Sequence, residues 1–321
     1  MKKARIICLA GLLLFAGCAP RQTQTQQPPI PETPASTATA AEATSLPVDD
    51  GADPQEEGGM TVTIGGEVFA YDGYRVIEPQ VTFDIHTKTA HDFVDDFDRE
   101  YPVERESYLL TPGTDTETTV VKITGSQPGP TIYVAAGIHG DERAAWYAGL
   151  MLQNVTIKAG TLYVLAPANA YGAQRNERRV GEDDPNRCFP GNENGTSAQR
   201  ICYAIFHDIE AREPELLLDL HEAIVYREGR DFLGSTLIYT SLEGMEDLFF
   251  DLLFATEDGE VTSCPFGYNG PGPAGSMNRT VTDELKIPSI TVETFRGFPM
   301  ERRVADQLKI VAYVLRYKGM L

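Results

Sequence analysis

The feature of this sequence that most constrains its fold is the hexapeptide Gly-Ile-His-Gly-Asp-Glu at residues 137–142. The apolar, β-branched run 131–136 before it predicts a buried strand, and the apolar spacing of 143–153 after it predicts a helix. His139 and Glu142 therefore stand where a strand ends and a helix begins, and the glycines permit a tight turn there. In an open α/β sheet, this position is the crevice in which ligands bind.

His139 and Glu142 can both reach one metal ion, and zinc accepts both ligand types. On its own, their spacing also fits a capped helix start that carries an ordinary surface histidine. A further candidate is His221, which ends the apolar run 216–220. That run predicts a buried strand, so His221 is expected at the same sheet edge as His139, as a third metal ligand or as a hydrogen-bonded core histidine. As a ligand, it would have its other ring nitrogen oriented by Asp219 or a backbone carbonyl.

A third buried run, 288–292, ends in the acidic residue Glu293. Burying a lone carboxylate is costly, so an acid at this edge predicts a site group. If two histidines and one glutamate hold zinc, the fourth position is open to water, and a nearby carboxylate can accept its proton.

The loop 176–191 lies between these candidate ligands and is polar, rich in arginine and bounded by proline and glycine. A guanidinium group binds a carboxylate through two parallel hydrogen bonds, and beside a metal it can stabilise an oxyanion. The loop is therefore a candidate substrate-binding segment, with a solvated charged loop as the alternative. The Gly- and Pro-rich loop 264–283 before the last strand is a candidate lid in which Tyr268 would touch substrate, or else an inert surface loop.

Alternating strand and helix patterns predict an α/β fold with a mixed, mostly parallel central sheet flanked by helices. The expected strands are 118–124, 131–136, 161–166, 215–220, 235–239 and 289–293. The expected helices are 143–153, 198–211, 243–255 and 301–318.

The N-terminus predicts export. A short basic head precedes an apolar run of eleven residues, 6–16, which is too short to cross a bilayer as a mature helix. The sequence Phe-Ala-Gly-Cys at 15–18 resembles a bacterial lipobox, so residues 1–17 are expected to be a lipoprotein signal peptide and Cys18 the acylated residue. An ordinary signal peptide with a chance cysteine is the alternative.

Residues 18–60 contain almost no large apolar side chains, so they are expected to form a disordered tether. Short β-type runs at 61–64, 68–71 and 81–85 predict a small N-terminal β extension over 61–104. The remaining residues, 105–321, are expected to form one large α/β domain.

The net charge of −20 argues against nucleic acid as a partner and provides no attraction to anionic lipid. Beyond the signal and the lipid site, the chain keeps three cysteines, Cys188, Cys202 and Cys264. An odd number excludes a disulfide framework as the organising principle and leaves one bridge open.

Four motifs occur in a characteristic order: H-G-D-E, R-x-x-x-x-D-P-N-R-x-F-P-G, D-L-H and T-V-E-T. Together they resemble the zinc carboxypeptidase superfamily, and within it the branch of succinylglutamate desuccinylase and aspartoacylase. The resemblance covers about residues 106–321 and implies one Zn²⁺ per chain. It implies that His139, Glu142 and His221 are the zinc ligands and that Glu293 is the general base.

The same resemblance implies roles for the loop arginines. Arg179 matches the arginine that polarises the scissile carbonyl, and Asn186 and Arg187 match the pair that holds a substrate carboxylate. Residues 105–321 are then expected to be a zinc hydrolase domain.

The expected function is that of a secreted, lipid-anchored zinc hydrolase that cleaves an amide bond in a carboxylate-bearing substrate, as an N-acyl amino acid deacylase does. It would lie outside the cytoplasm, held to the bacterial cell membrane through lipid on Cys18. A metallocarboxypeptidase or murein-peptide amidase is the alternative enzyme, acting on a peptide C-terminus. A non-catalytic substrate-binding lipoprotein is the alternative of another class, against which Glu293 argues because a binder needs no proton acceptor.

Overall fold

The computed structural model describes residues 60–64, 67–71, 76–223 and 233–321. The chain divides into two compact units, 1–56 and 57–321, and every described residue belongs to the second. The predicted signal peptide, the lipid site Cys18 and the tether as far as residue 59 lie outside the described residues. Among the helices that the structure describes, none combines the length and the apolar character that crossing a membrane requires.

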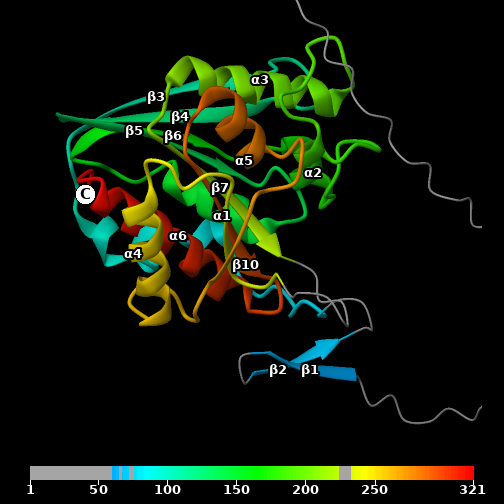
Figure 1. Cartoon of the computed structure of the whole chain (residues 1–321), viewed down its shortest axis with the longest axis vertical. Helices are drawn as coiled ribbons and strands as arrows, with labels where there is room; N and C mark the ends of the chain where they lie inside the picture. The colour runs from blue at the N-terminus through cyan, green and yellow to red at the C-terminus, as the bar shows by residue number, and fades with distance from the viewer. Residues whose placement is uncertain (1–59, 65–66, 72–75, 224–232) are drawn as a thin grey trace, which may run out of the picture. The chain divides into compact units, whose positions relative to one another are not determined.

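An eight-stranded sheet forms the centre of the described domain, in the order β3-β4-β6-β5-β7-β10-β8-β9 (Figure 1). Its strands are β3 Val103–Leu110, β4 Thr118–Gly125, β5 Gln127–Ala136, β6 Ala159–Leu165, β7 Leu216–Ala223, β8 Thr236–Tyr239, β9 Gly267–Asn269 and β10 Ser289–Phe295. The four central strands β6, β5, β7 and β10 are parallel. The pairs β3–β4, β4–β6 and β8–β10 are antiparallel, and β8–β9 is parallel. The predicted mixed, mostly parallel sheet is thus confirmed.

Helices cover both faces of this sheet (Figure 1). The helices are α1 Arg143–Leu152, α2 Ala170–Arg175, α3 Ser197–Arg212, α4 Glu246–Glu257, α5 Met277–Thr280 and α6 Met300–Tyr317. Helices α1, α4 and α6 contribute to one apolar core, and α3 and α5 to another. Alternate residues of β5 serve the two cores, with Ile132 and Val134 in the first and Tyr133 and Ala135 in the second. A strand buried on both faces reads as a continuous apolar run, which is why β5 and β7 were predictable.

The segment before β3 differs from its prediction. The two β-type runs predicted at 61–64 and 68–71 are strands, β1 (Met60–Ile64) and β2 (Glu67–Tyr71), and they pair antiparallel, but the prediction of β structure at 81–85 is wrong. Residues 81–84 have no regular structure, and a 3₁₀ helix begins at Ile85. The apolar side chains at 81, 83 and 85 pack against the core of the main domain, so extended chain alone explains their alternation.

Strand β3 was not predicted, because its sequence carries charges at three positions and its side chains are mostly exposed at the edge of the sheet. The expected boundary between residues 104 and 105 falls within this strand. Two further 3₁₀ helices, Ala90–Asp92 and Asp95–Asp98, precede it, and Phe97 is buried in the same core as α1 and α6. Cys188, Cys202 and Cys264 are free thiols.

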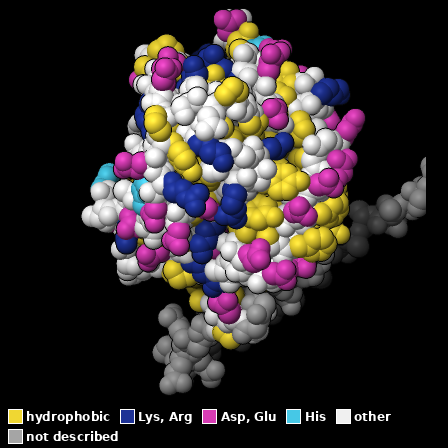
Figure 2. All heavy atoms as spheres, turned by 90° about the vertical axis from the view of Figure 1, so that its left-hand side faces the viewer, with side chains coloured by type: hydrophobic (Ala, Val, Ile, Leu, Met, Phe, Trp, Pro, Cys, Tyr) yellow, Lys and Arg dark blue, Asp and Glu magenta, His cyan; other side chains and the backbone are white. Residues whose placement is uncertain are grey.

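Charge is unevenly distributed over the surface. Figure 2 shows that the face on the left of Figure 1 carries lysine and arginine side chains gathered near its middle, with aspartate and glutamate around them. The net charge of −20 therefore does not translate into a uniformly acidic surface.

Candidate metal centre

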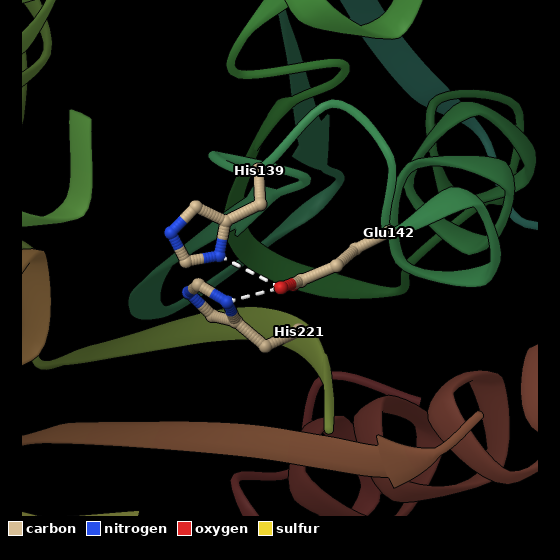
Figure 3. Close-up of side chains that lie close together, drawn as sticks. All are labelled: His139, Glu142 and His221. Carbon is tan, nitrogen blue, oxygen red and sulfur yellow. Dashed lines mark hydrogen bonds and ion pairs between the residues drawn. The ribbon is translucent and has the colours of Figure 1, made fainter. Parts of the chain in front are cut away.

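Three buried side chains meet at the carboxyl ends of the central strands. His139 and Glu142 lie in the loop that joins β5 to α1, and His221 lies near the end of β7. One ligand atom from each residue lies within 4.8 Å of the others. Nδ1 of His139 is 2.8 Å from Oε1 of Glu142, and Nδ1 of His221 is 2.8 Å from Oε2 (Figure 3). The structure thus brings together the three residues that the sequence proposed as ligands.

The loop that carries two of them is held tightly. Gly140 lies against α2, where a Cβ atom would come within 2.1 Å of the carbonyl carbon of Gly172, so only glycine fits there. The indole Nε1 of Trp146 donates to the Gly140 carbonyl at 3.1 Å, and the amide of Gly137 donates to Leu220 of β7 at 3.2 Å. Helix α1 and strand β7 therefore fix the loop at both ends.

Each histidine has a second carboxylate on its other ring nitrogen. Nε2 of His139 lies 3.0 Å from Oδ1 of Asp184, and Nε2 of His221 lies 3.1 Å from Oδ1 of Asp219. A proton on Nε2 of His139 can be donated to Asp184, which leaves Nδ1 of His139 available as a metal ligand. Nε2 of His221 lies close to Asp219, but Oδ1 of Asp219 has no hydrogen-bond partner among the described residues. Two imidazole nitrogens and one carboxylate at this spacing could hold one metal ion, and they are a donor set that zinc accepts. The residues present thus fit a zinc ion.

The acids and histidines of the cluster shift one another's pKa values. Burial alone would raise the pKa of Glu142, but His139 and His221 outweigh it and hold this pKa well below its usual value. Burial alone would lower the pKa of His221, but the Asp219 and Glu142 carboxylates raise this pKa well above its usual value. The pKa of Asp184 is lowered against the effect of its burial, chiefly by His139. In the absence of a metal ion, the acids and histidines of the cluster therefore stabilise one another's charged forms.

Glu293 lies on β10 directly beside His221, its partner in the parallel pairing with β7. Its side chain is buried, and Oε2 has no hydrogen-bond partner among the residues that the structure describes. Burial raises the pKa of Glu293 to about 7, with Glu142 and Asp219 adding to the effect and the histidines opposing it. A carboxyl with this pKa can accept and release a proton near neutral pH.

The arginines of the loop 176–191 differ in placement. Arg179 is exposed, and its guanidinium donates to the carbonyl of Glu182, away from the three clustered residues. Its neighbour Arg178 places Nη1 2.8 Å from Oε1 of Glu142 and Nε 3.8 Å from Oδ2 of Asp184. Sequence reasoning missed Arg178, because nothing in a polar loop indicates which of two adjacent arginines points inward.

Asn186 and Arg187 lie in a short 3₁₀ helix, Pro185–Arg187, next to the cluster. Asn186 is buried; its Nδ2 is 3.4 Å from Nε2 of His221, and its Oδ1 accepts from the amide of Met277 at 2.9 Å. Arg187 is exposed, and its guanidinium donates to the Asn186 carbonyl at 2.6 Å. The backbone N–H of Asn186 donates to Oδ1 of Asp184 at 2.9 Å. Asp184 was also missed, although it stands directly before the Pro-Asn-Arg of the motif.

Tyr268, the aromatic of the candidate lid, lies in the edge strand β9 and is 61% exposed. Gly267 beside it is aligned through Thr236 of β8 with Glu293 of β10. Gly267 of β9 is therefore level with the candidate base Glu293 across the sheet, two strands away.

The chain matches a known protein family. The family described as the succinylglutamate desuccinylase/aspartoacylase catalytic domain matches residues 128–313, from β5 into α6. No curated protein matches the chain.

Several solved structures share the fold. A succinylglutamate desuccinylase from Silicibacter sp. TM1040 is 18% identical, over 70% of this chain and 72% of that one, with a TM-score of 0.52. The product-bound ectoine utilization protein EutE (DoeB) from Ruegeria pomeroyi is 21% identical, over 70% and 69%, with a TM-score of 0.51. The tripeptide-bound cell shape determinant Csd4 from Helicobacter pylori is 18% identical, over 68% and 56%, with a TM-score of 0.52.

Proposed function

The chain belongs to the succinylglutamate desuccinylase/aspartoacylase family, and from this premise we propose that it is a zinc-dependent hydrolase of amide bonds in carboxylate-bearing substrates. The observation that carries the proposal is the position of each histidine between Glu142 and an outer carboxylate. The hydrolase fold of the family and the buried Glu293 beside His221 support it further.

The proposed zinc ligands are His139, Glu142 and His221. Zinc held by them would act as a Lewis acid toward the scissile carbonyl and lower the pKa of water. Glu293 accepts the proton of the attacking water through its unpartnered Oε2 and then delivers it to the leaving nitrogen. The raised pKa of Glu293 suits both steps, because the carboxyl must bind and release a proton in one cycle.

Arg187 and Asn186 are proposed to hold the substrate carboxylate. Asn186 lies within 3.4 Å of His221, so a carboxylate held here stands beside the proposed metal site. A guanidinium group recognises the carboxylate in a bidentate manner, which fixes the register of the substrate. Arg179 is proposed to polarise the carbonyl, which requires its side chain to turn from the Glu182 carbonyl toward the site.

The favoured substrate class is an N-acyl amino acid, in keeping with the family. A peptide C-terminus, including one from the cell wall, is the second candidate. The strand β9 favours a peptide substrate, because it is aligned with Glu293 and its three residues are all exposed. A substrate longer than an N-acyl amino acid could contact them. A non-catalytic binding protein is disfavoured, because it would have no use for a buried proton acceptor at this position.

The proposal extends to location. The lipobox-like sequence at 15–18 supports a secreted lipoprotein anchored to the bacterial cell membrane through Cys18. The hydrolase domain would then act outside the cytoplasm.

The experiment that tests the substrate class compares free and amidated carboxylates. We expect the full chain to hydrolyse N-acyl amino acids or short peptides and to lose most of this activity when the carboxylate is masked. Arg187→Ala should raise KM for the free carboxylate with less effect on kcat, because the contact is equally present in ground and transition states. Arg187→Lys should restore the loss only in part, since a point charge does not reproduce the fork.

If Arg187→Ala discriminates between free and masked substrates as well as wild type does, the carboxylate-binding assignment is wrong. If zinc-loaded wild type hydrolyses no N-acyl amino acid and no peptide, the proposed function itself is wrong.

A further inference from the structure

Two buried arginines lie beside the candidate metal centre and make no direct contact with its three ligands in the described structure. Arg303 of α6 is fully buried and forms an ion pair with Glu222 of β7. Arg296, which follows β10, is also buried, and its Nη1 is 2.9 Å from Oδ2 of Asp141. Both acids are chain neighbours of proposed ligands: Glu222 follows His221, and Asp141 precedes Glu142.

These two acids hold the segments that carry the ligands. Oε2 of Glu222 accepts from the amide of Ala144, in the first turn of α1, at 2.9 Å. The amide of Glu222 donates to Oε2 of Glu142 at 3.0 Å. Strand β7 and the start of α1 are thus joined around the carboxylate of Glu142. Asp141 lies inside the loop 137–142, so its ion pair with Arg296 holds that loop against the end of β10.

Glu78 lies next to Nη2 of both arginines, the terminal nitrogen that is not directed to Asp141 or Glu222. Its Oε1 forms an ion pair with Nη2 of Arg296, and its Oε2 lies 3.6 Å from Nη2 of Arg303. Each arginine therefore has Nη1 directed to an inner acid and Nη2 directed to Glu78. The backbone holds Glu78 in place, because Val76 is buried and the amide of Ile77 donates to the carbonyl of Ala70 in β2. Glu78 lies outside the family-matched segment 128–313.

We propose that Glu78 is a positioning residue for the metal centre, acting through Arg296 on Asp141, which precedes the proposed ligand Glu142. Arg303 is not part of this path, because its Nη2 lies 3.6 Å from Glu78 and has no hydrogen-bond partner among the described residues. This inference rests on the proposed zinc site. A buried guanidinium needs partners for its donors, and removing one partner leaves an uncompensated polar group. Without Glu78, Arg296 shifts to regain an acceptor, and Asp141 moves with it in the loop that carries Glu142. The N-terminal segment thereby becomes part of the machinery that sets metal affinity.

The test measures zinc affinity of the full chain by competition with a chromophoric chelator, together with the Tm of the metal-free protein. Glu78→Gln should weaken zinc binding by about tenfold, the lower end of the range for groups that support metal ligands. Glu78→Asp keeps the charge but shortens the side chain, so it should restore part of the affinity. Asp96→Asn is the matched control, because Asp96 also joins the N-terminal segment to α6, through Arg316. Arg316 lies about 20 Å along the helix from Arg303.

A double-mutant cycle separates positioning from general stability. Asp141→Asn should weaken zinc binding by itself, and adding Glu78→Gln should cost little more, because both act through Arg296. Additive losses in zinc affinity would overturn the proposal. It would also fail if Glu78→Gln altered zinc affinity no more than Asp96→Asn, or lowered only the metal-free Tm. Absence of zinc binding in wild type would instead refute the proposed zinc site itself.

Discussion

Glu293 of β10 is the direct partner of His221 of β7 in their parallel pairing, so the candidate base and a candidate zinc ligand lie side by side on neighbouring strands. Both are buried, and Oε2 of Glu293 has no hydrogen-bond partner within the described part of the chain. A single row of the sheet thus supplies a metal ligand and a proton acceptor.

The stability of the metal-free protein should depend on pH through Glu293. Its pKa is raised from 4.5 to about 7, mainly by burial. Between these two pH values, the folded state therefore keeps a proton on Glu293 that the unfolded chain has released. The contribution of Glu293 to stability therefore falls as pH rises through this window. We expect Glu293→Gln to raise the Tm of the metal-free protein, relative to wild type, by a few degrees more at pH 8 than at pH 5. Thermal unfolding at both pH values measures this, and an equal difference at both would contradict the account.

The outer carboxylates should set zinc affinity. Asp184→Asn and Asp219→Asn each remove the charge that orients a histidine through Nε2, so each should weaken zinc binding by about 10–100-fold. Chelator competition provides the measurement. Glu106→Gln is the control, because Glu106 is an exposed acid paired with Lys122 on strands β3 and β4. If the outer variants bind zinc as tightly as this control does, the histidines are not oriented in this way.

Arg178 and Arg179 should separate metal binding from carbonyl polarisation. Arg178 donates to Glu142, a proposed ligand, so Arg178→Ala should change zinc affinity. Arg179 makes no contact with the three ligands in the described structure, so Arg179→Ala should leave zinc affinity unchanged. If Arg179 polarises the carbonyl, that variant should lower kcat by about 10²–10³-fold, as for a lost oxyanion donor. Unchanged kcat in Arg179→Ala would remove this assignment and leave Arg178 as the arginine of the site.

Acylation should depend on Cys18. Wild type is expected to incorporate labelled fatty acid and to partition with membranes, because the lipid supplies the anchor. Cys18→Ser should not be labelled and should leave the membrane fraction. Cys188→Ser, at a free thiol in the hydrolase domain, is the control and should be labelled as wild type is. Equal labelling of Cys18→Ser and wild type would exclude Cys18 as the lipid site.

Most of the fold could be predicted, because the central strands are buried on both faces and therefore appear as continuous apolar runs. The same runs located the site, since His139, His221 and Glu293 are the polar residues at or just beyond the ends of three of them. Edge structure was harder to predict. Strand β3 carries the charges of an exposed edge, and the apolar alternation at 81–85 comes from chain packed on the core without a strand partner.

The arrangement of side chains in the polar loop 176–191 could not be predicted from the sequence either. Its composition indicates a binding segment, but the choice between Arg178 and Arg179 depends on how the backbone turns, which periodicity does not describe. Asp184 is a similar case, because only the folded loop shows that its carboxylate reaches Nε2 of His139. The buried pairs of Arg296 and Arg303 join segments far apart in the chain, so no local pattern could reveal them.

The measurement that tests the central claim most directly is the zinc content of the full chain after zinc supplementation and removal of loosely bound metal. The account predicts about one zinc per chain in wild type, since two histidines and one carboxylate hold the ion. Glu293→Gln should retain this zinc while losing roughly 10²–10⁴-fold in turnover, and His221→Ala should lose the zinc. Wild type without zinc, or His221→Ala with as much zinc as wild type, would contradict the account.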